Sequence, residues 1–445
     1  MSEQKGIAFL DRPVMQDRIA WWKVIYAFLI LFVVLTRLWA LAPRGYSHDE
    51  SIHAWESWKL ITGQGYSHNP TYHGPFLYHF TAFIFALFGH NDYTARLSPA
   101  LFGIALAILP LLLKKWLGKK GVLAATFLIA ISPVMMHRSR FLRHDVYVAT
   151  FNLLLFISSL RYLDQRKSKD LYLVAAAISL GFCAKETTFI TYFIFGTFWA
   201  LFFLYQWLQD GTRSWRELPV FDLIIVVGTL ILPLASPFPI KLLGGDPLDY
   251  TQQGILFSGG IFLVILGISV AIGFWWDWRR WLVCAGIFYG IFVPLFTSMF
   301  TNGQGFATGT VGQLGYWLSQ HGVRRGDQPP YYYFILMPIY EFLSLRGGIG
   351  GAIYFFSKGS PEDEGVEDAP TRIPFVPMLI YWSVLAFVIY SWAGEKMPWL
   401  TMHLALPLQL LAGWAIGRLF DADWGKLREK GAPWLLLLVP LFVYV

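Results

Sequence analysis

The strongest constraint on this chain is an apolar run of about 20 residues that recurs along the whole sequence. A helix needs about 20 mostly apolar residues to cross roughly 30 Å of hydrocarbon, and such runs extend from 25–41 to 434–445. Strands of a membrane barrel alternate apolar and polar residues, and these runs do not. Only 14% of the residues are charged, against about a quarter in soluble domains. The sequence therefore predicts an all-α, polytopic integral membrane protein.

We expect a single domain, 1–445, with about 13 transmembrane helices. The predicted spans are 21–42, 96–117, 121–136, 145–163, 170–184, 187–208, 220–236, 254–275, 281–300, 331–356, 374–393, 398–418 and 433–445. The first is too long for a signal peptide and lacks a small-residue cleavage site, so we expect it to be retained. The sequence ends within the last run, which leaves open whether the natural chain continues beyond Val445.

Basic residues orient the predicted spans. With a cytoplasmic N-terminus, and with the short apolar segment 76–90 lying along the surface, inner segments hold 22 of the 35 Lys and Arg residues. Outer segments hold 11, and Arg37 and Arg346 lie within spans, which completes the 35. This two-to-one bias is the positive-inside pattern. It predicts a cell-membrane protein whose first loop faces the non-cytoplasmic side, and it explains the net charge of +7 without any nucleic-acid partner.

Three polar segments stand out between the predicted spans. The first outer loop, 43–95, carries an acidic pair and the expected surface helix 76–90. The Gly-rich stretch 301–330 can form an outer lid. The acidic stretch 358–372 is typical of a mobile inner linker.

A second group of charged residues, which the positive-inside pattern does not explain, lies at the predicted outer ends of spans. We predict that they converge on one face and form a site, and they are Asp49, Glu50, His73, Arg96, Arg138, Arg140, Arg143, Asp145, Lys185, Glu186, Glu395 and Lys396.

The acidic pair allows two interpretations. A carboxylate at the interface, such as Asp49 or Glu50, can accept a proton from an acceptor hydroxyl, which is the role of a general base. The structural alternative is a helix end, in which Ser47 or Asp49 caps a helix that starts near Ser51.

The arginines suit a phosphate. A planar guanidinium donates two parallel bonds to a phosphate oxygen pair, and Arg138, Arg140 and Arg143 cluster on the side where few basic residues are expected. The alternatives are salt bridges to Asp145 or contacts with lipid headgroups.

Two adjacent pairs of opposite charge and a group of histidines complete the polar features. Lys185-Glu186 and Glu395-Lys396 lie at span ends, where a plain ion pair or an interface anchor is the alternative to substrate binding. A divalent metal is conceivable because histidines stand at 48, 53, 68, 73 and 79. No pair of them has the spacing of a strong ligand motif, so the sequence leaves a divalent metal open and predicts no particular cofactor.

The order of these features resembles the GT-C superfamily of membrane glycosyltransferases. It is similar to the branch of the dolichyl-phosphate-mannose protein mannosyltransferases and the lipid A aminoarabinose transferase. The features are the acidic pair, the Pro-rich turn, segment 94–103, the Arg-rich stretch that ends in Asp145, and 184–186. Segments 46–53 and 72–79 resemble most the flippase activity-associated family of prokaryotic N-glycosylation. The resemblance covers about residues 20–210.

This resemblance implies an inverting glycosyltransferase, mannosyltransferase-like, that uses a polyprenyl-phosphate-linked sugar. The acceptor would be a hydroxyl of a protein or glycolipid at the outer face of the membrane. The acidic pair of the family corresponds to Asp49 and Glu50, with Asp49 as the base, and an arginine of the family corresponds to Arg96. Its phosphate-side basic residues correspond to Arg140, Arg143 and Lys185.

One departure from the family and one rival function remain. The usual His-Pro-Pro-Leu turn is replaced by His73-Gly74-Pro75-Phe76. The rival function is a non-catalytic flippase component for lipid-linked sugars, or a partner in a glycosylation complex. Transporters hold polar groups near the midplane of the membrane, whereas here the polar groups gather at one predicted face, which favours the enzyme.

Overall fold

The computed structural model describes residues 20–209, 214–320, 322, 327–358 and 373–422, and its regular elements there are all helices, as predicted. These are α1 (Trp21–Leu38), α2 (His48–Ile61), α3 (Phe76–Phe88), α4 (Asp92–Ile108), α5 (Lys114–Ile131), α6 (Pro133–Ser139), α7 (Asp145–Gln165), α8 (Ser168–Ala184), α9 (Thr188–Gln209), α10 (Pro219–Ile231), α11 (Pro237–Leu242), α12 (Gln252–Phe296), α13 (Gln304–Ala307), α14 (Gln313–Gln320), α15 (Tyr332–Tyr340), α16 (Phe342–Lys358), α17 (Phe375–Trp392) and α18 (Thr401–Asp421).

Eight helical segments of the described chain are long and apolar enough to cross a membrane. Two of them, Asp92–Ile131 and Gln252–Phe296, are roughly twice as long as one crossing needs. Each is interrupted by a residue with non-helical dihedral angles, Gly118 in the first and Asp277 in the second, so each contains two helices. The count of 13 spans stays a prediction, and the last predicted span, 433–445, lies outside the described residues.

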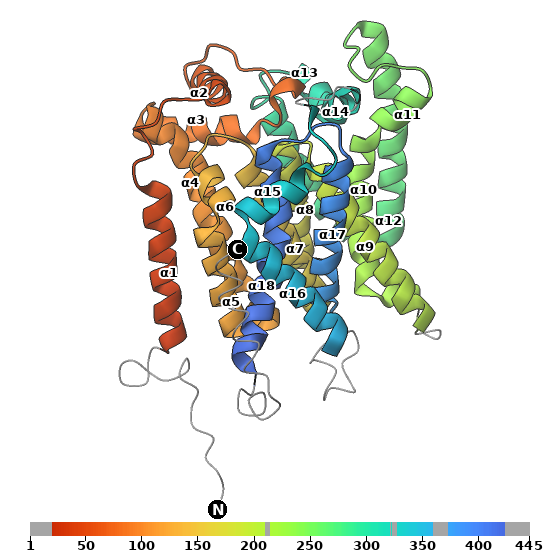
Figure 1. Cartoon of the computed structure of the whole chain (residues 1–445). Helices are drawn as coiled ribbons and strands as arrows, with labels where there is room; N and C mark the ends of the chain where they lie inside the picture. Colours follow the sequence, from red (N-terminus) through yellow and green to blue (C-terminus); the bar gives the residue numbers. More distant parts are fainter. Residues whose placement is uncertain (1–19, 210–213, 321, 323–326, 359–372, 423–445) are drawn as a thin grey trace, which may run out of the picture.

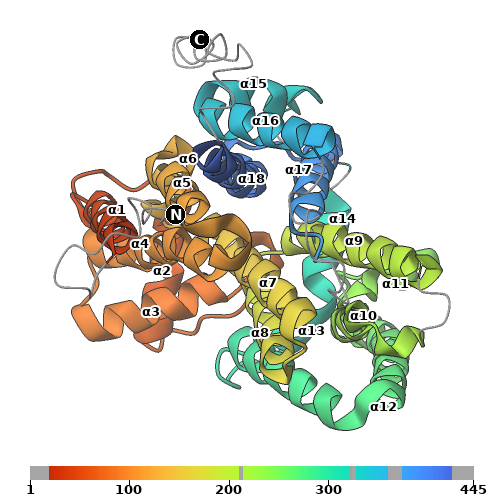
Figure 2. The same cartoon turned by 90° about the horizontal axis from the view of Figure 1, so that it is seen from below.

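The middle of the bundle is formed by α7 and α18 (Figure 2). In both, 89% of the apolar window is buried, whereas only 17% is buried in α1 and in α12, which lie at the periphery. Peripheral helices that expose apolar side chains in this way are typical of a bundle whose outer surface faces lipid.

Small residues allow α18 to approach its neighbour α5 closely. A Cβ atom at Gly413 would lie 2.6 Å from Cβ of Ala125, and one at Gly417 would lie 2.8 Å from the backbone nitrogen of Gly121. Both pairs are spaced by four residues, which places them on one helix face. This spacing of small residues is the usual device for helix packing in membranes.

One end of the bundle carries the short elements and will be called the α2 end. There α2, α3, α13 and α14 lie near the ends of the long helices, and α3 is roughly perpendicular to them (Figure 1). The predicted first outer loop, 43–95, therefore lies at this end. The opposite end holds the ion pair of Lys120 with Asp421, at 2.6 Å.

The predicted span 331–356 is not one helix, because it breaks at Glu341 between α15 and α16. The Glu341 carboxylate is buried and accepts hydrogen bonds from Ser344 Oγ at 3.0 Å and Gln409 Nε2 at 3.2 Å. Pro338, three residues earlier, lacks the N–H that a continuous helix would use. A polar side chain that needs partners inside the bundle and a proline together explain the break.

The stretch expected to form a lid, 301–330, is largely helical where it is described. It contains α13, a π-helical turn (Thr308–Gly312) and α14 at the α2 end. His68 of the first loop lies 2.7 Å from Thr308 Oγ1 through its Nδ1, and this contact ties the two segments together. Its role as a lid stays a prediction. The predicted linker 358–372 lies outside the described residues except for Lys358, where α16 ends.

Candidate active site

The acidic pair lies in the first turn of α2, where carboxylates are favoured by the helix dipole. Ser47 caps this helix, because its Oγ accepts a hydrogen bond from the Glu50 N–H, and the Glu50 carboxylate accepts one from the Ser47 N–H at 3.2 Å. The helix begins at His48, three residues before the start expected from the sequence. The capping alternative is therefore fulfilled by Ser47, which leaves the Asp49 carboxylate available for other contacts.

Glu50 is fully buried, and its two oxygens are occupied by donors. Arg96 donates to both oxygens, at 2.9 and 3.2 Å, and Arg44 and the Leu142 N–H donate to Oε1 at 2.9 and 3.2 Å. Burial raises the pKa of the Glu50 carboxyl group, but the bonds from Arg96, Leu142 and Ser47 outweigh burial and hold this pKa below its usual range. The carboxylate is therefore held as an anion by fixed donors.

Arg96, expected to bind substrate, lies fully buried beneath the first loop. Besides the two bonds to Glu50, its Nη1 donates to the carbonyl oxygens of Leu41 and Arg44, at 2.8 and 2.7 Å, and its Nη2 donates to that of Gly45 at 3.1 Å. These five bonds use the five N–H groups of a guanidinium. Arg96 thus has no donor left for a phosphate and fixes the loop that carries Asp49.

Asp49 is placed quite differently from its neighbour, because 41% of its side chain is exposed. Its Oδ2 accepts a hydrogen bond from Arg143 Nη1, and no described residue donates to its Oδ1. The guanidinium of Arg143 also lies over the Trp399 ring, 3.8 Å from the ring centroid. A carboxylate with one accessible oxygen thus lies beside a cation that is held by an aromatic ring.

The other two arginines of the predicted cluster differ in their contacts. Arg140 donates to the carbonyl oxygens of Thr36, Trp39 and Ala40, at 2.8, 2.6 and 3.0 Å, and so caps the C-terminal end of α1. Arg138 has no hydrogen bond or ion pair within the described chain and lies 6.0 Å from the Trp399 ring centroid. Burial lowers the pKa of Arg138. Arg138 and Arg143 therefore share one aromatic neighbour, while Arg140 is committed to α1.

Two ion pairs join the first loop and α7 to the end of α8. Lys185 Nζ lies 3.1 Å from Asp145 Oδ1, and both side chains are buried. His73 Nδ1 lies 2.9 and 3.1 Å from the two oxygens of Glu186. Burial raises the pKa of Glu186, but His73 and Lys185 outweigh it and hold this pKa below its usual range. The adjacent residues Lys185 and Glu186 therefore bind separate partners.

A histidine cluster surrounds these ion pairs. The ring of His144 contacts those of His53 and His73, with centroids 4.8 and 5.2 Å apart. Burial lowers the pKa of both His53 and His144 well below the usual range of histidine. Among the described residues, no group of three or more His, Cys, Asp or Glu is arranged to hold a metal ion.

Gly74 explains the departure from the His-Pro-Pro-Leu turn. Its N–H donates to the Ala184 carbonyl oxygen at 3.1 Å, and its carbonyl oxygen lies 3.2 Å from His144 Nε2. A Cβ atom at this position would lie 2.2 Å from the Cys183 carbonyl oxygen. Proline has neither the N–H nor the space, so this close approach of the first loop to α8 requires glycine.

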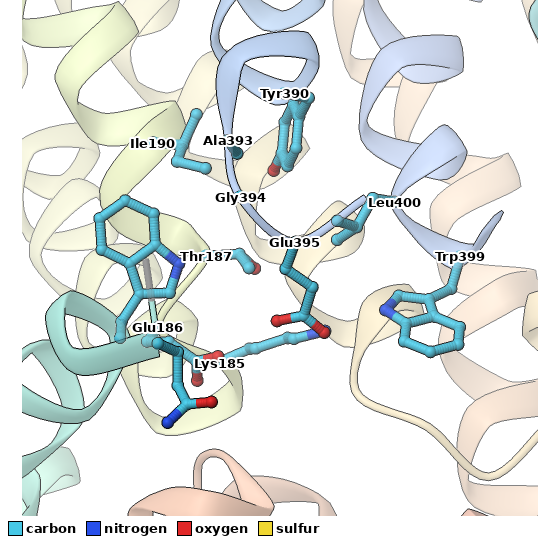
Figure 3. A pocket seen from close by; sticks show the side chains of 12 residues that line it. Lys185, Glu186, Thr187, Ile190, Tyr390, Ala393, Gly394, Glu395, Trp399 and Leu400 are labelled. Carbon is cyan, nitrogen blue, oxygen red and sulfur yellow. The ribbon is translucent and has the colours of Figure 1, made fainter. Parts of the chain in front are cut away.

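A pocket opens beside these residues, between α8–α9, α14 and the segment that joins α17 to α18 (Figure 3). It is lined by Lys185, Glu186, Thr187, Ile190, Trp317, Gln320, Tyr390, Ala393, Gly394, Glu395, Trp399 and Leu400. The Glu395 carboxylate points toward the end of the Lys185 side chain in this view. Lys396, predicted together with Glu395, is buried and donates to the Ala393 carbonyl oxygen at 2.8 Å.

The residues that the sequence reasoning missed are mostly aromatic or central in α18. Trp399 and Tyr390 line the pocket, and Nε2 of His403 lies 3.6 Å from Asp145 Oδ1. The sequence gives only a weak signal for Trp399 and Tyr390 as site residues, because a Trp or Tyr at a span end is typical of any membrane interface. Only the folded chain brings Trp399 to Arg143.

Two solved structures, AglB and ArnT, share the fold of this chain. The oligosaccharyltransferase AglB from Archaeoglobus fulgidus, solved with an inhibitory peptide and a dolichol-phosphate, is 16% identical over 95% of this chain, with a TM-score of 0.57. ArnT from Cupriavidus metallidurans, solved with undecaprenyl phosphate, is 17% identical over 94% of this chain, with a TM-score of 0.55. This chain covers 54% of the AglB chain, about half its length, and 65% of the ArnT chain.

Residues 72–240 match the family of the dolichyl-phosphate-mannose-protein mannosyltransferases. No curated protein matches the chain. The predicted resemblance to protein mannosyltransferases and ArnT is thereby confirmed. The apolar helices of span length support a multi-pass membrane protein.

Proposed function

We propose that this chain transfers a sugar from a polyprenyl-phosphate donor to an acceptor hydroxyl. The observation that carries the proposal is the contact of Arg143 with both Asp49 and Trp399, of which Trp399 lines the pocket. It sets a carboxylate with an accessible oxygen beside a cation suited to a phosphate. The GT-C fold supports the proposal, since AglB was solved with a dolichol-phosphate and ArnT with undecaprenyl phosphate.

In the proposed reaction, Asp49 takes the proton of the acceptor hydroxyl. The acceptor oxygen then attacks the anomeric carbon, and the bond from that carbon to the phosphate oxygen breaks. The polyprenyl phosphate leaves with both bonding electrons, and its growing negative charge is stabilised by Arg143 and Arg138. A single displacement of this kind inverts the anomeric centre. Holding donor and acceptor in line removes much of the entropic barrier.

Glu50 takes a different role in this proposal from that of its neighbour. A base needs an oxygen that the acceptor can reach, and the two oxygens of Glu50 already accept bonds from Arg96, Arg44, Ser47 and Leu142. Glu50 is therefore a positioning residue, which together with Arg96 fixes the first turn of α2. Asp49 remains as the base.

The donor would reach this site from the membrane. Its isoprenoid tail stays in lipid, while its phosphate and sugar lie at the level of the headgroups, where the α2 end meets water. The two-to-one distribution of basic residues supports a non-cytoplasmic location for this end. The acceptor would be a protein or glycolipid hydroxyl on that side.

Reconstitution tests the proposal directly. The purified full chain is incubated with short-chain polyprenyl-phosphate hexoses and a panel of peptide and glycolipid acceptors, and products are followed by mass spectrometry. We expect acceptor glycosylation with inversion, together with release of polyprenyl phosphate. Movement of donor across vesicle membranes without any glycosylated acceptor would contradict it and favour a flippase component.

A further inference from the structure

Arginines and tryptophans gather at the end of the bundle that is opposite the α2 end, and the proposed reaction gives them no role. Arg166 follows the end of α7, Arg216 lies in the helical turn Trp215–Glu217, and Arg280 lies in the second half of α12. Because α7 begins at the α2 end with Asp145 and extends for 21 residues, Arg166 lies at the opposite end. These three arginines will be called the arginine cluster.

A buried carboxylate draws two of these arginines together. Asp222 in α10 is 1% exposed, and its two oxygens accept hydrogen bonds from Trp276 Nε1, at 2.7 Å, and from the Tyr162 hydroxyl. Arg166 Nη2 and Arg280 Nη1 lie 3.5 and 3.8 Å from Oδ2 of Asp222. Both distances exceed the roughly 2.7–2.9 Å of a charge-assisted hydrogen bond. Asp222 therefore orients the two guanidinium groups without occupying their N–H groups fully.

Most N–H groups of the arginine cluster have no acceptor within the described chain. A guanidinium carries five N–H groups. Arg280 donates from Nε to Asp277 at 2.6 Å, and Arg166 Nη2 lies 3.4 Å from the Arg216 carbonyl oxygen. The Arg216 side chain makes no hydrogen bond or ion pair with a described residue and lies over the Trp275 ring, 4.4 Å from its centroid. The side chains of Arg166 and Arg280 are 41% and 31% exposed, so a ligand can reach these donors.

Tryptophan rings place the cluster at the level of lipid headgroups. The Trp215 and Trp275 rings stack with their centroids 5.9 Å apart, and Arg280 lies 4.7 Å from the Trp276 ring centroid. Trp275 and Trp278 are 51% and 52% exposed. Tryptophans at the ends of membrane helices are typical of the membrane–water interface, where the phosphate groups of phospholipids lie.

The arginine cluster has an excess of positive charge. Asp222 and Asp277 contact its guanidinium groups, so two carboxylates face three cations. The exposed residues next to the cluster in sequence are Glu217, Lys167 and Arg279, which add one negative and two positive charges. The planar fork of arginine suits the oxygens of a phosphate, and basic pockets between membrane helices are typical sites for anionic lipid headgroups.

The adjoining surface of α12 is apolar and suits acyl chains. The first half of this helix leads from the α2 end to the cluster and exposes Leu263, Ile268 and Phe274. Only 17% of the apolar window of α12 is buried. A free phosphate ion would use the arginines alone, whereas a phospholipid would use both the arginines and this surface.

We propose that the arginine cluster binds the phosphate of an anionic phospholipid from the adjacent leaflet, with its acyl chains along the first half of α12. The proposal is independent of sugar transfer. One phosphate would contact Arg166 after α7, Arg216 before α10 and Arg280 in α12. The lipid would therefore join three segments that are distant in the sequence.

Lipid titrations of the purified full chain in detergent test the proposal. The chain is titrated with phosphatidylglycerol and with phosphatidylcholine of the same acyl chains, and bound lipid is measured by native mass spectrometry. We expect phosphatidylglycerol to bind about tenfold more tightly. One Lys or Arg near a membrane surface changes the affinity for anionic lipid about fivefold, so Arg216→Gln should weaken phosphatidylglycerol binding by about that factor. Adding Arg166→Gln should weaken it further, to about 25-fold.

Two controls separate the cluster from other basic residues and a phospholipid from a free phosphate. Arg418→Gln is the matched variant, because Arg418 lies at the same end and over the Trp414 ring, and it should leave the affinity unchanged. Glycerol phosphate has the headgroup phosphate without acyl chains and should not displace phosphatidylglycerol at equal concentration. Arg166 and Arg216 are exposed, so their variants should keep the wild-type melting temperature before lipid is added.

Three results would overturn the proposal. The first is equal affinity for the two lipids, and the second is a loss in Arg216→Gln that is absent or is matched by Arg418→Gln. The third is displacement of the lipid by glycerol phosphate at equal concentration, which would show a site for free phosphate. None of these results bears on sugar transfer at the α2 end.

Discussion

Arg143 donates a hydrogen bond from Nη1 to Oδ2 of Asp49, and this bond joins the first turn of α2 to the segment between α6 and α7. Asp49, the proposed base, is thus hydrogen-bonded to Arg143, the residue proposed to bind the phosphate. The bond uses one of the five N–H groups of the guanidinium. Under the proposed function, Arg143 can therefore bind the donor phosphate while it holds the Asp49 carboxylate nearby.

Removal of Arg143, the residue proposed to bind the donor phosphate, should weaken donor binding. Loss of a charge-assisted hydrogen bond costs about 1.5–3 kcal/mol, so Arg143→Ala should raise the Kd for polyprenyl phosphate roughly 10- to 100-fold, as measured by calorimetry in detergent. Arg418→Ala is the matched control, because Arg418 also lies over an indole ring, that of Trp414, at 6.0 Å. Equal effects of the two changes would point to misfolding and contradict the assignment.

Arg140 should behave differently from Arg143, although the sequence places them three residues apart. Its guanidinium is bound to three carbonyl oxygens at the end of α1. Arg140→Ala should therefore lower the melting temperature in detergent and leave the Kd for polyprenyl phosphate nearly unchanged. A weakened affinity at unchanged stability would assign Arg140 to the phosphate instead.

The buried pair of Glu50 and Arg96 should dominate the stability of the first loop. Removing one partner of a buried ion pair costs about 3–5 kcal/mol, so Arg96→Ala should lower the melting temperature strongly. Arg44 also bonds Glu50, but 44% of its side chain is exposed, so Arg44→Ala should cost much less. A similar decrease in melting temperature for the two variants would contradict this account, in which burial makes the bonds of Arg96 more stabilising than those of Arg44.

Replacement of Gly74 by proline tests why this chain has glycine in the turn where the family has proline. Gly74→Pro removes the N–H that bonds the Ala184 carbonyl oxygen and introduces atoms that clash with the Cys183 carbonyl oxygen. The variant should unfold at a lower temperature than Gly45→Ala, a control position where no atom lies within 4 Å of an added Cβ. A fully stable Gly74→Pro chain would mean that the first loop can move away from α8.

Because of its buried histidines, we expect the folded chain to lose stability at acidic pH. Burial lowers the pKa of His53 and His144 in the folded chain, whereas in the unfolded chain histidine titrates near 6.5. Below about pH 6.5 the unfolded chain therefore binds more protons than the folded one, and stability falls as the pH falls. The pKa of Glu186 is also lowered, so its contribution to stability is lost only at more acidic pH. The melting temperature should fall from pH 7 to pH 5, and His144→Gln should reduce this slope, whereas a change at the exposed His48 should not.

The sequence predicted the all-helical class, because in lipid an apolar run of span length satisfies its backbone hydrogen bonds as a helix. The break at Glu341 escaped it, since the carboxylate is bonded by Ser132, Ser344 and Gln409 from three different parts of the chain. Contacts of that kind depend on which helices become neighbours. A hydropathy pattern does not contain this information.

For the site, the sequence supplied the charged residues but not their individual contacts. Asp49 and Glu50 are adjacent and chemically alike, yet one is 41% exposed and the other fully buried. From the sequence, Arg140 is predicted to bind phosphate and Arg96 to bind substrate, and their carbonyl partners are known only from the folded chain. The family pattern does not contain the packing of each side chain, and this packing separates a structural role from a chemical one.

The assignment of Asp49 as the base is tested most directly by Asp49→Asn. Asn keeps the shape and an oxygen that accepts the bond from Arg143, but it does not take up a proton at neutral pH. The rate of sugar transfer in a single turnover, measured on variants with wild-type melting temperatures, should fall by about 10²–10⁴, with donor affinity nearly unchanged. Glu50→Gln, confirmed to be folded, should retain far more activity. Transfer by Asp49→Asn at the wild-type rate would contradict the catalytic role of Asp49.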